Sequence, residues 1–272
     1  MKTRILTGTI SAVLFLTVLI LPWPIVLTVV TSLLAAIAVY EVFSVADLLK
    51  NRGLESVAMV FAAIAPFFNK MSPWAITITC IVYVAMLVLM VLMYNREVSY
   101  KKTVPAFVLS AAVTLALSCM SYLRDVRDHG LFYVILALLM AWMSDTGAYF
   151  TGTFFGKHKL CPKLSPKKTV EGLVGGILTS VFVSMAAAVV YQLVIVKATA
   201  QVNYFGVLLL ALVCAPLSVA GDLAASFIKR VCDVKDFGKL FPGHGGVLDR
   251  FDSLLPVFPL VYAVALWLPI VV

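Results

Sequence analysis

The stretch from residue 74 to residue 94 reads WAITITCIVYVAMLVLMVLMY, and it contains no charged residue. A helix needs about 20 mostly apolar residues to cross the hydrocarbon core of a bilayer. This stretch therefore predicts a membrane-spanning helix. Eight more apolar runs follow the same pattern, at roughly 5–21, 25–46, 54–69, 104–123, 131–154, 173–196, 204–220 and 254–271. The sequence predicts an all-α, polytopic membrane protein with about nine transmembrane helices.

Composition supports this fold class. Of the 272 residues, 62% are hydrophobic and only 12% are charged, whereas soluble domains carry about 25% charged residues. These values exclude a disordered chain, a basic domain that binds nucleic acid and an ordinary cytosolic enzyme. The net charge of +8 is therefore attributed to basic cytoplasmic loops and to contact with anionic lipid or phosphate. The five scattered cysteines predict neither a disulfide framework nor a thiolate metal site.

Two details of the span pattern stay open. The run at 54–69 is short enough to be tilted or re-entrant. The first two runs, separated by Pro22-Trp23-Pro24, could instead form a hairpin that does not fully cross. A second break falls at Lys50-Asn51-Arg52-Gly53.

The distribution of basic residues predicts the orientation. Cytoplasmic loops of membrane proteins carry an excess of Lys and Arg. With nine spans and a cytoplasmic N-terminus, Lys70, Arg124, Arg127 and Lys197 fall outside and the other 17 of the 21 basic residues fall inside. We expect one membrane domain, residues 1–272, with its C-terminus outside. The short chain without a targeting extension favours a bacterial inner membrane.

Two polar segments, 144–172 and 221–253, fall on the predicted cytoplasmic side, so we expect catalytic chemistry there. In the first, Asp145 lies near the end of an apolar run, where an ionisable group is costly and is a functional candidate. It could equally be a helix-end carboxylate that reaches the interface. The order Ser165-Pro166-Lys167-Lys168-Thr169 places cations and a hydroxyl before a span, which suits a phosphate. The alternative is a basic membrane anchor.

The second segment is denser in charge. If the eighth span continues as a helix, Asp222, Ser226 and Lys229 or Arg230 share one face. The part that follows cannot be helical throughout, because Pro242 and the glycines of this stretch interrupt it.

Asp249 and Asp252 are three residues apart and are predicted to share a face at the start of the last helix. Carboxylates, cations and glycines in one loop suit a polyphosphate with Mg²⁺, which prefers oxygen ligands. A salt-bridged transporter loop is the alternative. His244 could cap a turn or act as a general base.

The segment from Ser226 to Asp252 resembles the signature of phosphatidate cytidylyltransferases. That signature reads S-x-x-K-R, four residues, K-D, then H-G-G-x-x-D-R-x-D. The matching positions here are Ser226, Lys229-Arg230, Lys235-Asp236, His244-Gly245-Gly246, Asp249-Arg250 and Asp252. The segments Ser144–Tyr149, Phe155–Leu160 and Ser165–Thr169 resemble other shared segments of the family. Two positions depart from it: Ala225 stands where Glu is frequent, and Thr153 where a cation is frequent.

The resemblance implies transfer of a cytidylyl group from CTP to phosphatidic acid, giving CDP-diacylglycerol and pyrophosphate in phospholipid biosynthesis. It also implies a helical membrane homodimer with its site facing the cytoplasm. Both reactants are anionic, so cations and metal should provide most of the catalysis. We expect Mg²⁺, with a second, monovalent cation left open.

The expected residue roles follow from this chemistry. The expected metal ligands are Asp222, Asp249 and Asp145. The expected catalytic residues are Asp222, Asp249, Lys229, Arg230, Ser226 and His244. The expected substrate-binding residues are Ser165, Lys167, Lys168, Thr169, Arg250, Gly245 and Gly246.

Four other functions are compatible with parts of the sequence. A cytidylyltransferase for an ether-linked isoprenoid phosphate would use the same chemistry. A transporter or channel predicts repeated halves, which the sequence lacks. A lipid-binding scaffold has no need of three site aspartates. A pseudoenzyme is hinted at only by Ala225.

Overall fold

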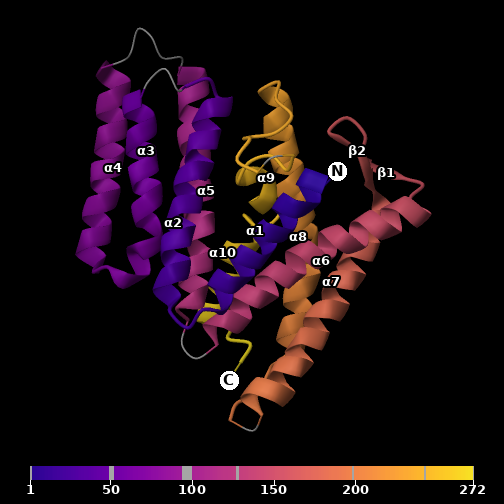
Figure 1. Cartoon of the computed structure of the whole chain (residues 1–272). Coiled ribbons are helices and arrows are strands. Elements are labelled where there is room, and N and C mark those ends of the chain that lie inside the picture. Colours follow the sequence, from indigo (N-terminus) through magenta and orange to yellow (C-terminus); the bar gives the residue numbers. More distant parts are fainter. Residues whose placement is uncertain are drawn as a thin grey trace. The chain divides into compact units, whose positions relative to one another are not determined.

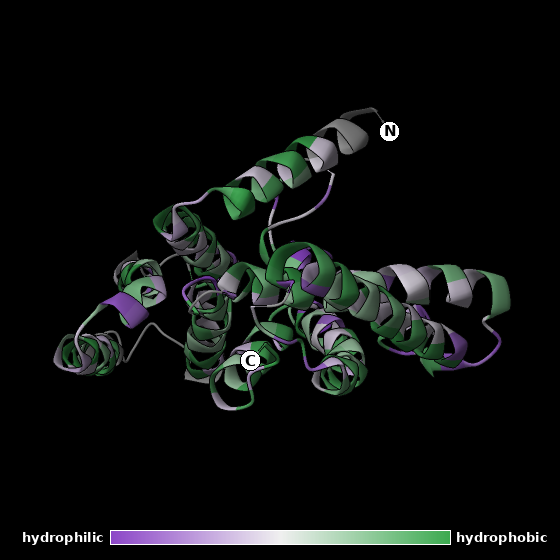
Figure 2. Cartoon of the chain, turned by 90° about the horizontal axis from the view of Figure 1, so that it is seen from below, coloured by the Kyte–Doolittle hydropathy of each residue, from purple (hydrophilic) through white to green (hydrophobic). Residues whose placement is uncertain are grey.

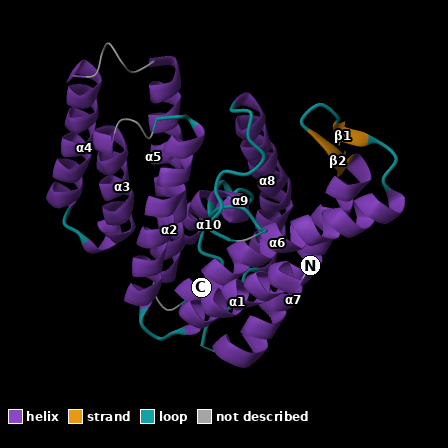
Figure 3. Cartoon of the chain, turned by 45° about the horizontal axis from the view of Figure 1, so that its top comes forward, coloured by secondary structure: helices purple, strands orange, loops and turns teal. Residues whose placement is uncertain are grey.

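The structure is a computed structural model that describes residues 2–48, 52–93, 100–126, 129–197, 199–241 and 243–271 (Figure 1). The α-helices are α1 (Lys2–Ile20), α2 (Pro24–Val45), α3 (Arg52–Ile64), α4 (Pro73–Met93), α5 (Tyr100–Arg124), α6 (Gly130–Phe155), α7 (Val170–Tyr191), α8 (Tyr204–Val231), α9 (Leu248–Phe251) and α10 (Val257–Trp267). A 3₁₀ segment, η1 (Ala65–Lys70), follows α3, and a π-helical segment, η2 (Gln192–Val196), follows α7. The strands β1 (Lys159–Cys161) and β2 (Ser165–Thr169) form an antiparallel hairpin, drawn in orange in Figure 3.

The all-α membrane fold is confirmed. Within the described residues, each of the nine predicted apolar runs overlaps one of the helices α1–α8 and α10. In the part of the chain that the structure describes, five of these helices are long and apolar enough to cross a membrane: α2, α5, α6, α7 and α8. The count of nine spans stays a prediction. Of the basic residues that support this count, Lys50, Arg96 and Arg127 lie outside the described residues.

Exposed apolar side chains fit helices that face lipid. On α4, Trp74, Ile78 and Leu92 are among the large apolar residues exposed to the surroundings. Figure 2 shows the hydrophobic colour along the helices and the hydrophilic colour mainly at their ends and in the connections. In water such exposure would be unfavourable, whereas hydrocarbon tails solvate it.

The chain divides into two compact units. The first comprises residues 1–122 and 232–250, and the second comprises residues 123–231 and 251–272.

The first unit is built on α2. Its buried face includes Ala35, Val39 and Phe43, and the ring of Phe43 contacts the edge of Phe107 at a centroid distance of 5.3 Å. The predicted run 54–69 is split into α3 and η1, because Pro66 has no backbone N–H to continue the α-helical pattern.

The second unit is built on the packing of α6, α7 and α8. Small residues line the buried face of α7, including Gly176, Ser180 and Ser184, and they allow its backbone to approach α6 closely. The Ser180 hydroxyl donates to the carbonyl of Met140 at 2.9 Å, and Ser144 donates to the carbonyl of Ala215 at 3.3 Å. These bonds tie the polar groups of the helices together inside the unit.

Two expectations about the polar segments are settled by the fold. The eighth span does continue as a helix, since α8 extends to Val231. The placement of Asp249 and Asp252 at the start of the last helix is wrong. Asp249 lies in α9, a helix of four residues, and turns at residues 252–256 separate it from α10.

Candidate active site

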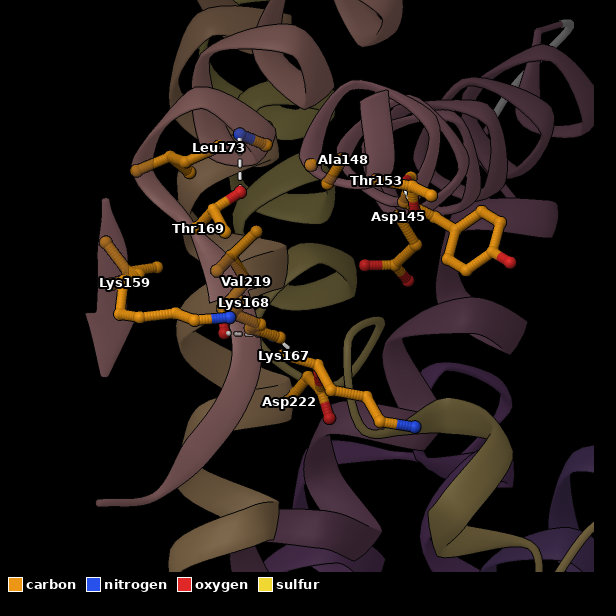
Figure 4. A pocket seen from close by; sticks show the side chains of 14 residues that line it. Asp145, Ala148, Thr153, Lys159, Lys167, Lys168, Thr169, Leu173, Val219 and Asp222 are labelled. Atoms are coloured by element: carbon orange, nitrogen blue, oxygen red, sulfur yellow. Dashed lines mark hydrogen bonds and ion pairs between the residues drawn. The ribbon is translucent and has the colours of Figure 1, made fainter. Parts of the chain in front are cut away.

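A pocket of about 450 Å³ opens in the second unit (Figure 4). Helices α6, α7 and α8 and both strands of the hairpin contribute to it. Its charged lining residues are Asp145, Lys159, Lys167, Lys168 and Asp222. Figure 4 shows the carboxylate of Asp145 turned into the pocket from α6. The pocket thus joins the two polar segments, 144–172 and 221–253, that the sequence singled out.

An ion pair between Lys168 and Asp222 lies in this pocket. The Lys168 Nζ atom is 2.5 Å from Asp222 Oδ2, and it also donates to the carbonyl of Val219 at 3.4 Å. Both side chains are partly buried, so their attraction is screened less than on an open surface. The pair brings one predicted phosphate-binding cation onto one predicted metal ligand.

The β-hairpin positions the lysines. Lys159 pairs with Thr169, and Cys161 pairs with Ser165. Because successive side chains of a strand point to opposite faces, Lys167 is exposed while Lys168 is partly buried.

The start of α7 fixes this hairpin. The hydroxyl of Thr169 accepts from the backbone N–H of Gly172 at 3.1 Å and caps the helix. Glu171, in the first turn, accepts from the backbone N–H groups of Lys157 and His158, and its Oε1 lies 2.6 Å from His158 Nδ1. Thr169 therefore lines the pocket while its oxygen supports the helix. Ser165, predicted to bind substrate, is at the start of β2 and is not among the pocket-lining residues.

Two more carboxylates, those of Asp145 and Asp252, belong to the polar centre of this unit. Asp145 is hydrogen-bonded to the side chain of Ser253, and Asp252 Oδ1 accepts from the Ser253 backbone N–H at 2.8 Å. Burial and the negative charges of Asp222 and Asp145 raise the pKa of Asp252 to about 7, while Lys229 opposes that rise. Asp252 thus belongs to a group of mutually repelling carboxylates, although no role was assigned to it from the sequence.

Helix α8 carries three more of the predicted residues. Ser226 follows Asp222 by one helical turn, and Lys229 and Arg230 occupy the last turn. Cations there interact favourably with the negative end of the helix dipole. Lys229 also faces the charge of Asp252, whereas Arg230 is exposed.

The loop that carries the glycines of the signature belongs to the first unit. Asp249 Oδ2 accepts from the backbone N–H groups of Phe237 at 2.8 Å and Gly246 at 2.9 Å. Arg250 Nε donates to the carbonyl of His244 at 2.8 Å. Gly245 has a φ of +83°, a conformation that favours glycine. Asp249 and Arg250 therefore help to fold the loop.

The signature crosses between the units twice, between Val231 and Cys232 and between Arg250 and Phe251, so it contributes to both. In the second unit it supplies Ser226, Lys229 and Arg230 to α8 and Asp252 to the carboxylate group. In the first unit it supplies the loop of His244, Gly245, Gly246, Asp249 and Arg250.

Within the described ranges, no group of three His, Cys, Asp or Glu side chains is arranged to hold a metal ion. The predicted set of Asp222, Asp249 and Asp145 therefore stays a prediction.

One contributor to the signature loop was missed by sequence reasoning. Glu41 of α2 is buried and accepts hydrogen bonds from the backbone N–H groups of Val247 and Leu248. A lone acidic residue inside an apolar run was the available signal.

Comparison with known proteins supports the chemistry suggested by the pocket. A family model described as "Cytidylyltransferase family" matches residues 2–268. A protein of Bacillus subtilis strain 168 named phosphatidate cytidylyltransferase is 34% identical over 271 residues, covering 96% of each chain. A protein of the same name from Staphylococcus epidermidis strain RP62A is 36% identical, covering 96% of this chain and 97% of the relative. Another, from Staphylococcus aureus strain COL, is 34% identical with the same coverage.

Proposed function

The chain belongs to the cytidylyltransferase family, and on that premise we propose that it converts CTP and phosphatidic acid to CDP-diacylglycerol and pyrophosphate. A phosphate oxygen of the lipid attacks the α-phosphorus of CTP. The new P–O bond forms as the bond between the α-phosphorus and its bridging oxygen breaks, and pyrophosphate leaves with that electron pair. The lipid phosphate is largely ionised near neutral pH, so the reaction needs no strong general base.

The observation that carries this proposal is the Lys168–Asp222 pair inside the pocket of the second unit. Two anionic reactants repel each other, so the site must supply positive charge where they meet. Lys167, Lys168 and Lys159 line the pocket and provide it. Asp222 holds the Lys168 ammonium group in place, which reduces the reorganisation needed when phosphate enters.

The aspartates of the second unit fit a hard divalent cation. Asp222, Asp145 and Asp252 repel one another, and a cation with oxygen ligands would relieve that repulsion. We propose that Asp222 and Asp145 hold Mg²⁺, while a role of Asp249 as a further ligand stays a prediction from the sequence. When bound, Mg²⁺ neutralises phosphate charge and polarises the reacting phosphoryl group.

We also propose a membrane location and an oligomeric state for the enzyme. The basic loops support a cytoplasm-facing site in the inner membrane of a bacterium. Resemblance to the family supports a homodimer and leaves room for a monovalent cation. Light scattering of the detergent-solubilised protein tests the homodimer.

Turnover by the purified protein tests the reaction. Detergent-solubilised enzyme is given CTP labelled at the α-phosphate, phosphatidic acid and Mg²⁺, and the label in the lipid phase is counted. We expect lipid-soluble label, and none with EDTA or with CTP labelled at the γ-phosphate. Label that enters an ether-linked isoprenoid phosphate but not phosphatidic acid would replace the substrate. Label in neither lipid, from folded protein, would contradict the proposal.

A further inference from the structure

Glu41 lies far from the signature in sequence but contacts it directly in the first unit. Its side chain is on α2 and is only 3% exposed. Oε1 accepts from the N–H of Val247 at 2.9 Å, and Oε2 accepts from the N–H of Leu248 at 3.0 Å. The two carboxylate oxygens thus bind two consecutive amides, immediately before Asp249.

Two glycines of the loop lie so close to this carboxylate that neither position has room for a side chain. A Cβ atom added at Gly246 would lie 2.1 Å from Glu41 Oε1, and one added at Gly238 would lie 2.3 Å from the same atom. Real Cβ atoms do not approach so closely. Both positions therefore need glycine because Glu41 occupies the space where a side chain would stand.

A second carboxylate completes the support. Asp249 Oδ2 binds the N–H groups of Phe237 and Gly246. Glu41 contacts Gly246 as well, and it also contacts Gly238, which follows Phe237 in the chain. The two limbs of the loop, 237–238 and 246–248, are thus held by Glu41 and Asp249 together.

Burial of the Glu41 carboxylate costs free energy. A buried carboxylate without a basic partner is unfavourable, and among the described residues its hydrogen-bond partners are backbone amides. A carboxylate is the side chain that offers two acceptor oxygens and no donor, so it can receive two adjacent N–H groups at once. An amide side chain would turn its NH₂ group toward one of them.

We infer that Glu41 is a positioning residue for the transfer reaction: it holds the backbone at Val247 and Leu248 and so sets the placement of Asp249 and Arg250. The catalytic part of this inference rests on the proposed function. Glu41 itself touches no reacting group in this account.

Amide exchange in the metal-free, lipid-free protein tests the structural hold. Full-length wild type, Glu41→Gln and Glu55→Gln are compared in detergent by hydrogen exchange. Glu55 is a carboxylate of the same unit in the first turn of α3. In Glu41→Gln, the peptide that contains Val247 and Leu248 should exchange about tenfold faster, because one acceptor is lost. Wild-type exchange there would overturn the inference, and Glu55→Gln should match wild type.

Kinetics test the positioning role separately. For Glu41→Gln we expect kcat to fall about tenfold or more while KM for CTP changes less than about threefold. The Mg²⁺ concentration for half-maximal rate should rise, because Asp249, a metal ligand predicted from the sequence, is misplaced. A protein that had merely lost stability would show a lower active fraction with an unchanged Mg²⁺ midpoint, and that result would contradict the positioning role.

A double-mutant cycle addresses the contact itself. Gly238→Ala should lower kcat because its methyl group collides with Glu41. In the Glu41→Ala background that collision is gone, so adding Gly238→Ala should cause no further loss. Additive losses would contradict the inference. If wild type forms no CDP-diacylglycerol, the proposed function fails, whereas the exchange data still decide whether Glu41 holds the loop.

Discussion

The pocket of the second unit and the signature loop of the first unit both use carboxylate side chains, but in opposite ways. In the pocket, Asp222 faces an ammonium group, that of Lys168. In the loop, Glu41 and Asp249 face backbone amides. A carboxylate that pairs with a lysine side chain can release it to a phosphate and take a metal ion in its place, whereas carboxylates that bind backbone amides fix a chain conformation. The comparison indicates that the pocket supplies charge and the loop supplies placement.

The largest effect should come from the pocket. Asp222→Asn removes a carboxylate charge from the centre of the polar group while keeping its shape, so turnover should fall by about a hundredfold or more. Labelled CDP-diacylglycerol formation measures it, and a cooperative melting curve shows that the protein is folded. Asp233→Asn, at an exposed residue with a φ of +54° that Asn tolerates, should retain wild-type turnover. Wild-type turnover in Asp222→Asn would remove this carboxylate from the mechanism.

A smaller effect is expected from the loop. Gly245→Ala places an L side chain at a φ of +83°, with its Cβ 2.7 Å from Asp249 Oδ2. Left-handed backbone costs about 1–2 kcal/mol for such a residue, and displacement of Asp249 adds to the loss of rate. We expect turnover to drop about tenfold.

Gly206→Ala provides the matched control for that loop variant. The nearest atoms that its added methyl group would meet belong to the side chain of Asn203, at 3.3 Å. It should leave turnover unchanged. Equal effects of the two substitutions would mean that the loop conformation does not matter for catalysis.

The smallest effect should appear as stability. Thr169→Ala removes the cap of α7, which costs about 1 kcal/mol, while Thr169→Ser keeps the oxygen that accepts from Gly172. Thermal unfolding should occur at a lower temperature for the Ala variant only, with turnover within a few-fold of wild type. A large rise in KM for CTP without a change in melting temperature would instead support the predicted substrate-binding role of Thr169.

Much of the fold was readable from local patterns. Apolar runs predicted the helices. The sequence left open whether the eighth span continues past its apolar run, and α8 does continue, which places Asp222, Ser226 and Lys229 on one helix. Such features depend on neighbours within a few residues. The predicted start of the last helix was wrong, because the spacing of Asp249 and Asp252 alone does not distinguish a single helical turn from the start of a longer helix.

The features that were missed depend on distant parts of the chain. Glu41 and Val247 are 206 residues apart in sequence, and no local period connects them. The β-hairpin was missed because Pro166, Lys167 and Lys168 are poor strand formers. Its conformation is supported instead by contacts with Glu171. The role of Asp252 depends on burial, which its place in the signature does not reveal.

The most direct test of the central claim is CTP binding by Lys168→Ala. Binding of labelled CTP with Mg²⁺ is measured in detergent without lipid, beside wild type and Lys163→Ala, an exposed lysine of the same hairpin that does not line the pocket. We expect Lys168→Ala to weaken binding about tenfold or more, and Lys163→Ala to bind as wild type does. Equal affinity of all three proteins would contradict the claim that this pocket receives the phosphates of CTP.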